Sequence, residues 1–192
     1  MFNSLHESGH YPTKSSLAGV RRIKLTKSEM GYLIVQLLAQ LDGDNLLAVK
    51  LCLATGARWN EAAMLTSSQL LDDRVTFVKT KNGNNKTVPV SPELIASIRK
   101  GKNHILFPDV DYTTVRNTIK SIAPNLPNGQ ATHVLRHTFA SHFIMNGGNI
   151  LALQRILDHA NILQTMVYAH FAPDYLTEAV RFNPIADELK MQ

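Results

Sequence analysis

The residues in this chain best suited to chemistry are arginines, histidines, a lysine and a tyrosine that occur in short clusters. The densest cluster is His133-Val-Leu-Arg136-His137. At about 100° per residue, His133, Arg136 and His137 share one face of a helix, beside an apolar stripe. This combination suits a phosphate, because guanidinium is a bidentate charged donor and imidazole exchanges protons near neutral pH.

The same cluster also admits a metal site, because His133 and His137 stand at positions i and i+4. Val134 occupies the position at which a zinc protease carries glutamate, and no neighbouring cysteine or acidic cluster completes a ligand set. The sequence therefore favours a phosphate site with no metal and no cofactor. A histidine-metal hydrolase is kept as an alternative.

Two further basic residues occur at positions where we expect their charge to be exposed, one at the start of a helix and one at a turn. Arg58 follows a glycine break and begins a helix, where unpaired amides and a guanidinium together can bind an anion. An ion pair with Glu61, three residues on, is the alternative. Lys81 lies at the turn of an expected hairpin, from which it can reach into an active site or stay a solvated loop charge.

His159 and Tyr168 complete the set of candidates. Tyr168 lies in an apolar stretch, where a tyrosine is usually a core residue with a satisfied hydroxyl. The combination makes it a candidate for chemistry: two arginines, a lysine, two histidines and a tyrosine, without a carboxylate pair or a nucleotide-binding loop.

Periodicity and capping signals predict the helices that position these residues. Thr26-Lys-Ser-Glu29 is a capping box before an amphipathic helix that ends before Gly43. Further helices are expected at about 45–55 (apolar nearly all round and therefore central), 59–65, from Ser91-Pro92-Glu93 onward, 112–122, 132–146, 150–159, 162 through Tyr168, and after Pro173.

A small sheet is expected between these helices. Val75 to Val78 and Thr87 to Val90 predict two strands joined around Asn82-Gly83, and Pro89 places the second strand at an edge. Residues 105–107 are a candidate for one more short strand. The predicted fold class is mostly α with a small antiparallel β-sheet.

Composition sets the broad class of protein. The chain has 192 residues, of which 44% are hydrophobic and 18% charged, so it has material for a core and too little charge for a disordered chain. The single cysteine, Cys52, excludes a disulfide framework and an all-cysteine metal site. No apolar run approaches the ~20 residues of a membrane span, and no signal peptide is visible. We expect a soluble intracellular domain.

The net charge of +5 is unevenly distributed. It is concentrated in residues 1–28 and 74–102, and the second segment holds seven basic residues against one acidic residue. This pattern is compatible with a polyanionic partner, of which nucleic acid is the commonest, and equally with two solvated surfaces. Residues 1–24 show no periodicity and are expected to form a poorly ordered linker or arm.

Together these motifs resemble the catalytic domain of the tyrosine recombinases, the phage integrase family, and in particular the integrases of temperate phages and prophages. The resemblance runs from about Ile23 to Pro184. The matching segments are Thr55-Gly-Ala-Arg58-Trp-Asn-Glu61, the His-Xaa-Leu-Arg-His-Thr box from His133 to Thr138, Leu157-Asp158-His159 in place of Leu-Gly-His, and Thr165-Met-Val-Tyr168-Ala-His170.

The resemblance implies a mechanism that needs neither metal nor ATP. Tyr168 would attack a scissile DNA phosphate and form a 3′-phosphotyrosyl bond. The other implied roles are proton acceptor for His133, phosphate-oxygen binding for Arg58 and Arg136, proton donor to the leaving 5′-oxygen for Lys81, and hydrogen-bond donor for His159. Arg74, Lys79 and Lys86 are expected to contact DNA, and the two lysines are the fallbacks for Lys81.

The resemblance also implies partners and organisation. The expected function is integration and excision of phage or prophage DNA in the bacterial cytoplasm, at the nucleoid. The expected partners are double-stranded attachment sites, a host DNA-bending protein and three further copies in a homotetramer that exchanges C-terminal segments. We expect a catalytic domain at 25–182 and a tail at 183–192. The family usually places a core-binding domain before this one, so the chain is expected to be an excised catalytic fragment or a truncated product.

Asp158 departs from the family pattern. A carboxylate in place of glycine would raise the pKa of His159 or repel phosphate, and it removes the residue that a tight turn favours. A catalytically decayed DNA-binding or assembly module is therefore an alternative. A type IB topoisomerase or a hairpin-forming resolvase is another, because it would use the same chemistry.

Overall fold

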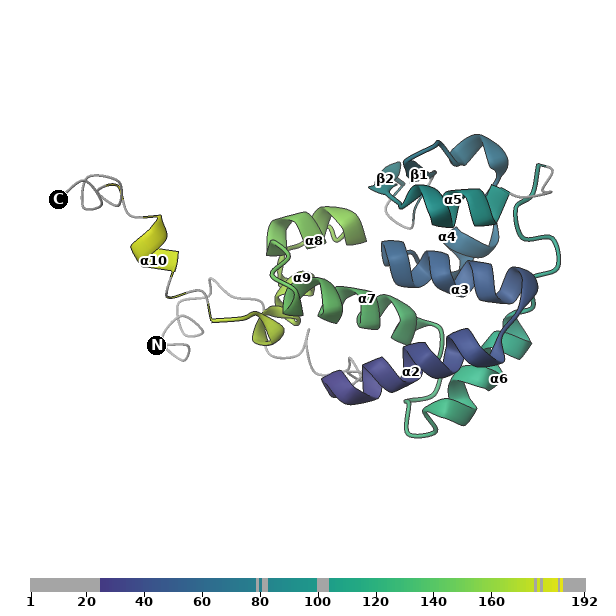
Figure 1. Cartoon of the computed structure of the whole chain (residues 1–192), viewed down its shortest axis with the longest axis horizontal. Helices are drawn as coiled ribbons and strands as arrows, with labels where there is room; N and C mark the ends of the chain where they lie inside the picture. Colours follow the sequence, from purple (N-terminus) through teal and green to yellow (C-terminus); the bar gives the residue numbers. More distant parts are fainter. Residues whose placement is uncertain are drawn as a thin grey trace.

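The structure is a computed structural model that describes residues 25–78, 80, 83–99, 104–174, 176, 178–182 and 184. These residues are mostly helical, with one two-stranded antiparallel sheet, which confirms the predicted fold class (Figure 1). The predicted arm at 1–24, the hairpin lysines Lys79 and Lys81, and all of the predicted tail except Pro184 lie outside the described residues.

The elements follow the predicted order closely. The strands are β1 (Arg74–Phe77) and β2 (Lys86–Pro89), and two 3-10 turns are η2 (Ser67–Gln69) and η3 (Ala169–Phe171). The helices are α2 (Lys27–Gln40), α3 (Gly43–Thr55), α4 (Trp59–Ala63), α5 (Pro92–Arg99), α6 (Tyr112–Ile122), α7 (His133–Met145), α8 (Ile150–Leu157), α9 (Leu163–Met166) and α10 (Glu178–Arg181).

Two helices begin at the caps that the sequence marks. The Thr26 amide donates to Glu29 Oε2 at 2.7 Å, and the Glu29 amide donates back to Thr26 Oγ1 at 3.3 Å. The predicted capping box of α2 is therefore confirmed. Asn149 Oδ1 accepts from the amides of Leu151 and Ala152 and so satisfies the first turn of α8.

The predicted hairpin is present, but its connection is longer than a two-residue turn. Phe77 pairs with Lys86 and Arg74 with Pro89, so the strands are joined by residues 78–85. Since the sheet has two strands, Pro89 is on an edge, as its missing N–H requires. The third strand expected at 105–107 is absent from the described residues, where only a single bridge joins Ile105 to Thr66.

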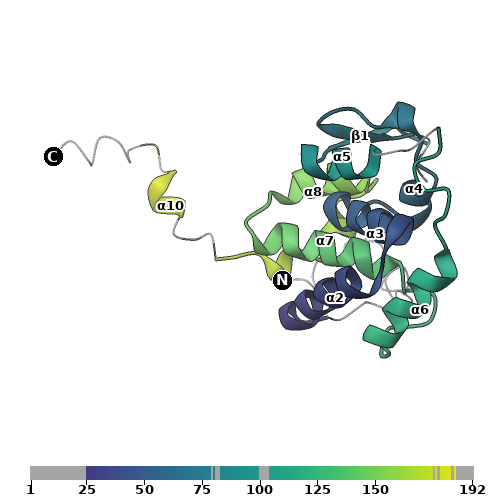
Figure 2. The ribbon, with the colours of Figure 1, turned by 45° about the vertical axis from the view of Figure 1, so that its right-hand side comes forward.

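The core lies around α3 and α7. Figure 1 shows α2 and α6 along one side of this pair, with α4, α5 and the hairpin on the other, and Figure 2 agrees. Ala48, Val49, Leu51 and Cys52 of α3 are all fully buried, which confirms the predicted central helix.

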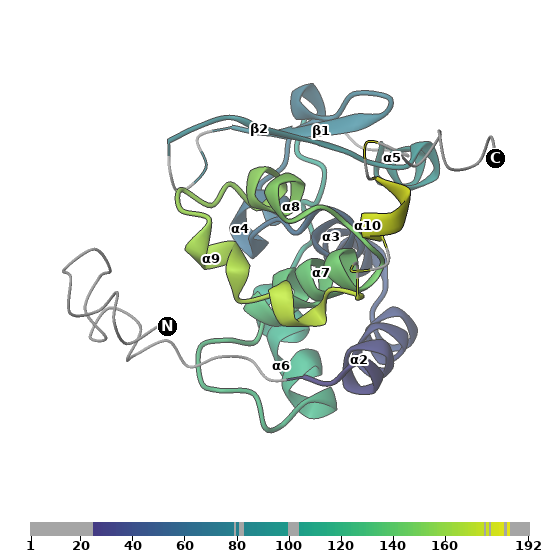
Figure 3. The same ribbon diagram turned by 90° about the vertical axis from the view of Figure 1, so that its left-hand side faces the viewer.

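Two features at the edge of the domain bear on function. β2 crosses beside α8, and the two are in contact (Figure 3). In Figures 1 and 2, α10 lies away from the rest of the structure. No helix among the described residues is both long and apolar enough to cross a membrane.

Candidate active site

Arg136 of α7 joins three segments of the chain. Its side chain is buried, with 7% of the residue exposed, and Nη1 donates to Gly56 O at 2.9 Å while Nη2 donates to Leu157 O at 2.5 Å. Burial, followed by the charge of Arg58, lowers the pKa of Arg136 to about 10. The guanidinium is still charged at neutral pH and is fixed at the ends of α3 and α8.

Gly56 makes this arrangement possible. Its φ of 64° is in the left-handed region, and a Cβ there would lie 2.5 Å from Phe139 Cδ1 and 2.7 Å from Leu157 Cδ2. Only glycine both adopts this conformation without strain and lets α7 and α8 approach so closely. The glycine of the Thr-Gly-Ala-Arg58 segment therefore presents its carbonyl to Arg136.

Arg58 is held by Glu61. Its Nη1 donates to Glu61 Oε1 at 2.7 Å, and its backbone amide donates to Glu61 Oε2 at 3.0 Å. The ion pair that the spacing allowed is present, but it is largely buried, with side-chain exposures of 23% and 11%. Burial is the largest influence on Glu61 and raises its pKa, but Lys86 and Arg58 together outweigh it and the pKa is lowered.

Lys86 is not at the surface, in contrast to the DNA contact expected from the sequence. It is 5% exposed, its Nζ lies 3.4 Å from Glu61 Oε2, and it sits 4.7 Å from the centroid of the Phe77 ring. Lys86 lies on the face of β2 that points into the domain, and the carboxylate of Glu61 compensates its charge there. Burial lowers the pKa of Lys86, and the charges of Arg136 and Arg58 add to the effect. Lys86 supports Glu61 and, through it, Arg58.

Arg74 has the exposed position that a DNA contact needs. It forms an ion pair with Asp73, Nε to Oδ1 at 2.7 Å, and half of its side chain is exposed. Its contact with DNA stays a prediction.

Tyr168 lies just beyond the short helix α9, not within a helix as predicted. Its amide donates to Thr165 O, which tightens the chain into a 3-10 turn before η3. The residue is 5% exposed and packs with Leu153 and Leu157 in a small second core between α7 and α8. Burial raises the pKa of the Tyr168 phenol to about 12, although Arg136 acts in the opposite direction.

His137 is the partner of the tyrosine, a contact that the sequence did not reveal. The Tyr168 hydroxyl lies 2.8 Å from His137 Nδ1. Burial, and then the charges of His133 and Arg136, lower the pKa of His137 to about 4, so its imidazole is neutral and can accept a hydrogen bond from the phenol. Its spacing from His133 suggested a metal ligand, and no local pattern could indicate a partner 31 residues away. His133 itself is exposed on the first turn of α7.

His159 follows the end of α8. Its Nδ1 lies 2.9 Å from Thr165 Oγ1. Burial, with the charges of Arg136 and Arg58, lowers the pKa of His159 to about 4. Asp158 does act to raise this pKa, as its sequence position suggested, but the other influences are larger.

The described residues thus place five of the six predicted catalytic residues in one region. The charges of Arg58, Arg136 and His137 all act on His159, those of His133 and Arg136 act on His137, and that of Arg136 acts on Tyr168. Lys81, the sixth, lies outside the described residues. Within the described part of the chain, no three side chains of metal-ligating types lie together.

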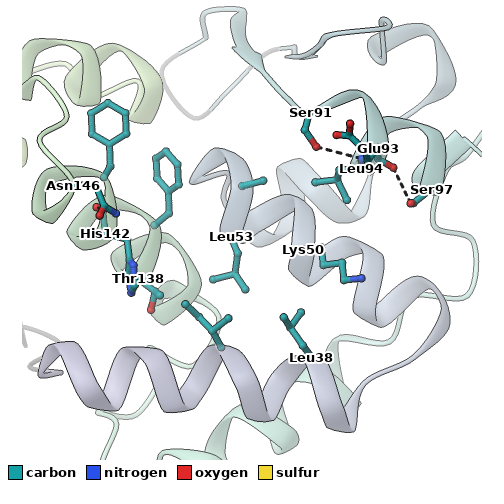
Figure 4. A pocket seen from close by; sticks show the side chains of 14 residues that line it. Leu38, Lys50, Leu53, Ser91, Glu93, Leu94, Ser97, Thr138, His142 and Asn146 are labelled. Carbon is teal, nitrogen blue, oxygen red and sulfur yellow. Dashed lines mark hydrogen bonds between the residues drawn. The ribbon is translucent and has the colours of Figure 1, made fainter.

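A separate groove of about 640 Å³ lies between helices of the domain. Its walls come from α2, α3, α5 and α7, and Figure 4 shows Leu38, Leu53 and Leu94 facing it. None of the five catalytic candidates that the structure describes lines this groove.

Comparison with known proteins agrees with this geometry. The sequence profile of the phage integrase family matches residues 24–174. The integrase of Escherichia phage P2 is 52% identical over 189 residues, which cover 96% of this chain and 56% of that protein. The integrase of Haemophilus phage HP1 (strain HP1c1) is 47% identical over 195 residues, which cover 97% and 57%. The chain thus spans a little over half the length of these relatives.

Solved structures give the same result. The catalytic domain of bacteriophage HP1 integrase superimposes with a TM-score of 0.75 at 48% identity, covering 85% of this chain and 96% of that domain. The XerH recombinase bound to its palindromic difH substrate, at 20% identity and a TM-score of 0.62, shares the fold. Since the family profile matches residues 24–174 and so includes every residue of this site, the chain belongs to the phage integrase family.

Proposed function

We propose that the chain cleaves and rejoins double-stranded DNA through a 3′-phosphotyrosyl intermediate, and so integrates and excises phage or prophage DNA in the bacterial cytoplasm. The observation that carries this proposal is the position of the Tyr168 phenol in the same site as the buried guanidinium of Arg136 and its neighbour Arg58. A phenol beside two fixed cations can attack a phosphodiester and form a covalent ester.

The proposed cleavage step exchanges one phosphate ester for another. The Tyr168 oxygen forms a bond to phosphorus, the bond from phosphorus to the 5′-oxygen breaks, and the 3′-phosphate stays on the enzyme. His133 accepts the phenolic proton, and Lys81 gives a proton to the leaving 5′-oxygen. Attack by a 5′-hydroxyl reverses the step, so rejoining needs no ATP.

The two arginines would bind the non-bridging phosphate oxygens. Arg136 already donates to two carbonyl oxygens, and Arg58 to Glu61, so both guanidiniums are fixed before DNA arrives. Fixed cations stabilise the negative charge of a pentavalent transition state without reorganising. Arg136 also favours ionisation of the phenol.

Because Tyr168 is buried, its hydroxyl must leave His137 before it can attack DNA. With its hydroxyl at His137 and only 5% of the residue exposed, Tyr168 must exchange His137 for the scissile phosphate. In this proposal His137 holds the phenol until DNA binds. His159 is neutral and its Nδ1 is paired with Thr165 Oγ1; in the tautomer that carries the proton on Nε2, it would donate from Nε2–H to the same phosphate.

Covalent trapping tests the proposal. The probe is a pool of short duplexes with randomised sequence around a nick in one strand, so that a cleaved fragment diffuses away and the covalent complex accumulates. We expect an SDS-resistant protein–DNA band that is lost in Tyr168→Phe and unchanged by EDTA, and sequencing of the trapped DNA would identify the target. Tight binding with no covalent product would support the decayed-module alternative instead.

The topoisomerase alternative has its own readout. Relaxation of a supercoiled plasmid without selection of any trapped sequence would favour a type IB topoisomerase. Enrichment of one sequence in the trapped pool, together with strand joining between two such duplexes, is the result we expect for an integrase.

We further propose that four copies assemble on two attachment sites, aided by a host DNA-bending protein, and exchange C-terminal segments. In support, α10 lies away from its own domain, and Phe182 and Leu176 are 67% and 82% exposed. The groove between α2, α3, α5 and α7 has apolar side chains that such a segment would cover (Figure 4).

A further inference from the structure

The end of α8 has a backbone conformation that needs an explanation. Asp158 has φ 51° and ψ 48°, and no other non-glycine residue in the described part of the chain has a positive φ. Aspartate tolerates the left-handed region better than most residues, but glycine enters it without strain. The family pattern has glycine at this position, so the carboxylate of Asp158 replaces the residue that best suits the turn.

The side chain of Asp158 makes a long-range contact. Asp158 Oδ2 accepts a hydrogen bond of 2.5 Å from Thr80 Oγ1, a residue 78 positions earlier in the chain. Thr80 is 4% exposed. A short hydrogen bond from a buried hydroxyl to a carboxylate is of the stronger, charge-assisted kind.

Thr80 belongs to the connection between β1 and β2. Its amide donates to Asn84 O at 3.0 Å, and its carbonyl accepts from the Gly83 amide at 2.7 Å. The bond to Asp158 therefore attaches a folded part of this connection to the end of α8. β2 and α8 also touch along the same side (Figure 3).

The end of α8 is also part of the phosphate site. The carbonyl of Leu157, directly before Asp158, accepts from Arg136, and His159 directly follows Asp158. Asp158 thus connects the hairpin to the segment that orients two of the candidate catalytic groups.

We propose that Asp158 is a positioning residue that, through its hydrogen bond to Thr80, anchors the hairpin connection at the phosphate site. This inference rests on the proposed function, in which Lys81, the residue after Thr80 in the sequence, protonates the leaving 5′-oxygen. The step that depends on the anchor is accordingly protonation of the leaving group. Asp158 is then an adaptation of the site and not a sign of its decay.

A double-mutant cycle in the trapping assay tests the contact. Thr80→Val removes the donor with little change of shape, and Asp158→Gly removes the acceptor while restoring the residue that the turn favours. We expect each to slow formation of the covalent complex roughly tenfold or more, and the double variant to be no slower than either single one. Asp158→Asn keeps an acceptor and tolerates the turn, so it should retain most of the rate.

A substrate with sulfur in place of the bridging 5′-oxygen separates positioning from general loss of structure. A thiolate leaves without a proton because thiols are far more acidic than alcohols. On this substrate the Thr80→Val and Asp158→Gly enzymes should react at the wild-type rate. An equal slowdown on both substrates, or additive effects of the two changes, would overturn the inference.

Hydrogen exchange provides a readout that does not depend on activity. In both single variants, the amide of Gly83 should exchange faster than in the wild-type chain, while amides of α3 should not change. Unchanged exchange at this amide would also refute the anchor. Failure of the wild-type chain to trap DNA would refute the proposed function, whereas normal trapping by Asp158→Gly would refute this inference alone.

Discussion

The cations of this site are held in different ways, and this determines what each can do. Arg136 is fixed by backbone carbonyls and Arg58 by the carboxylate of Glu61, whereas Lys86 is buried against Phe77 and neutralises Glu61 from the other side. We therefore expect Lys86 to have a structural role, because a buried carboxylate without a counter-charge would be costly.

Comparison of Lys86 with Arg74 tests this difference. Lys86→Met should destabilise the domain by about 3 kcal/mol, because it leaves Glu61 less compensated. Arg74→Ala should change stability by less than about 0.5 kcal/mol but reduce the dependence of DNA affinity on salt by about one counterion. Urea denaturation and DNA binding at several salt concentrations would measure both. The interpretation fails if Lys86→Met alters the salt dependence and leaves stability intact.

Two partly buried histidines, His137 and His159, predict how stability depends on pH. The pKa of His137 and of His159 is lowered to about 4 in the folded chain, below the ordinary value of 6.5. Between these values the unfolded chain binds more protons, so stability is fully present above about pH 6.5 and is lost as the pH falls toward 4. The urea midpoint should drop between pH 7 and pH 4.5.

The variant His137→Asn provides the control for this pH dependence. Asparagine keeps an acceptor near the Tyr168 hydroxyl but does not titrate. The stability of this variant should fall less steeply with acid than that of the wild-type chain. An identical slope in both would show that His137 does not titrate as its burial requires.

At the scale of elements, helix ends meet at the site, and the chain makes each end with a specific residue. At the site, the end of α3 depends on Gly56 and the end of α8 on Asp158, whereas the start of α8, at the opposite end of that helix, depends on the Asn149 cap. The caps and the breaks are local signals, which is why nearly every helix could be predicted to within a few residues.

Two glycines that both have a positive φ make a matched test of the packing at α3. Gly56→Ala should destabilise the domain by about 2–4 kcal/mol, because a Cβ meets Phe139 and Leu157 in addition to the strained φ. Gly83→Ala, with φ 79° and no atom within 4 Å of the added Cβ, should cost only about 1 kcal/mol. Chemical denaturation would measure both. Equal losses would mean that backbone strain alone, without the contacts of the added Cβ with Phe139 and Leu157, sets the cost of the substitution at Gly56.

At the scale of the whole molecule, the domain presents a catalytic region and, apart from it, an apolar groove. If copies exchange C-terminal segments, changes in the segment and in the groove should have the same effect. Phe182→Asp and Leu38→Asp, which alter exposed side chains, should leave the unfolding transition within about 0.5 kcal/mol of the wild type and reduce assembly on nicked duplex DNA. Sedimentation velocity with the DNA probe would measure this. Undiminished assembly in both variants would refute the exchange.

The sequence alone determined the helices, the hairpin, the family and most of the site, because caps, periodicity and motif spacing are local properties. It did not determine the partner of Tyr168, the burial of Lys86 or the contact of Asp158 with Thr80, since those residues are 25 to 78 positions from their partners. Only the packing of α4, α7, α8, the hairpin and the segment after α9 brings these groups within hydrogen-bond distance. The residue types and their spacing therefore indicated the chemistry, whereas the tertiary structure decided which side chains hold the reactive groups in place.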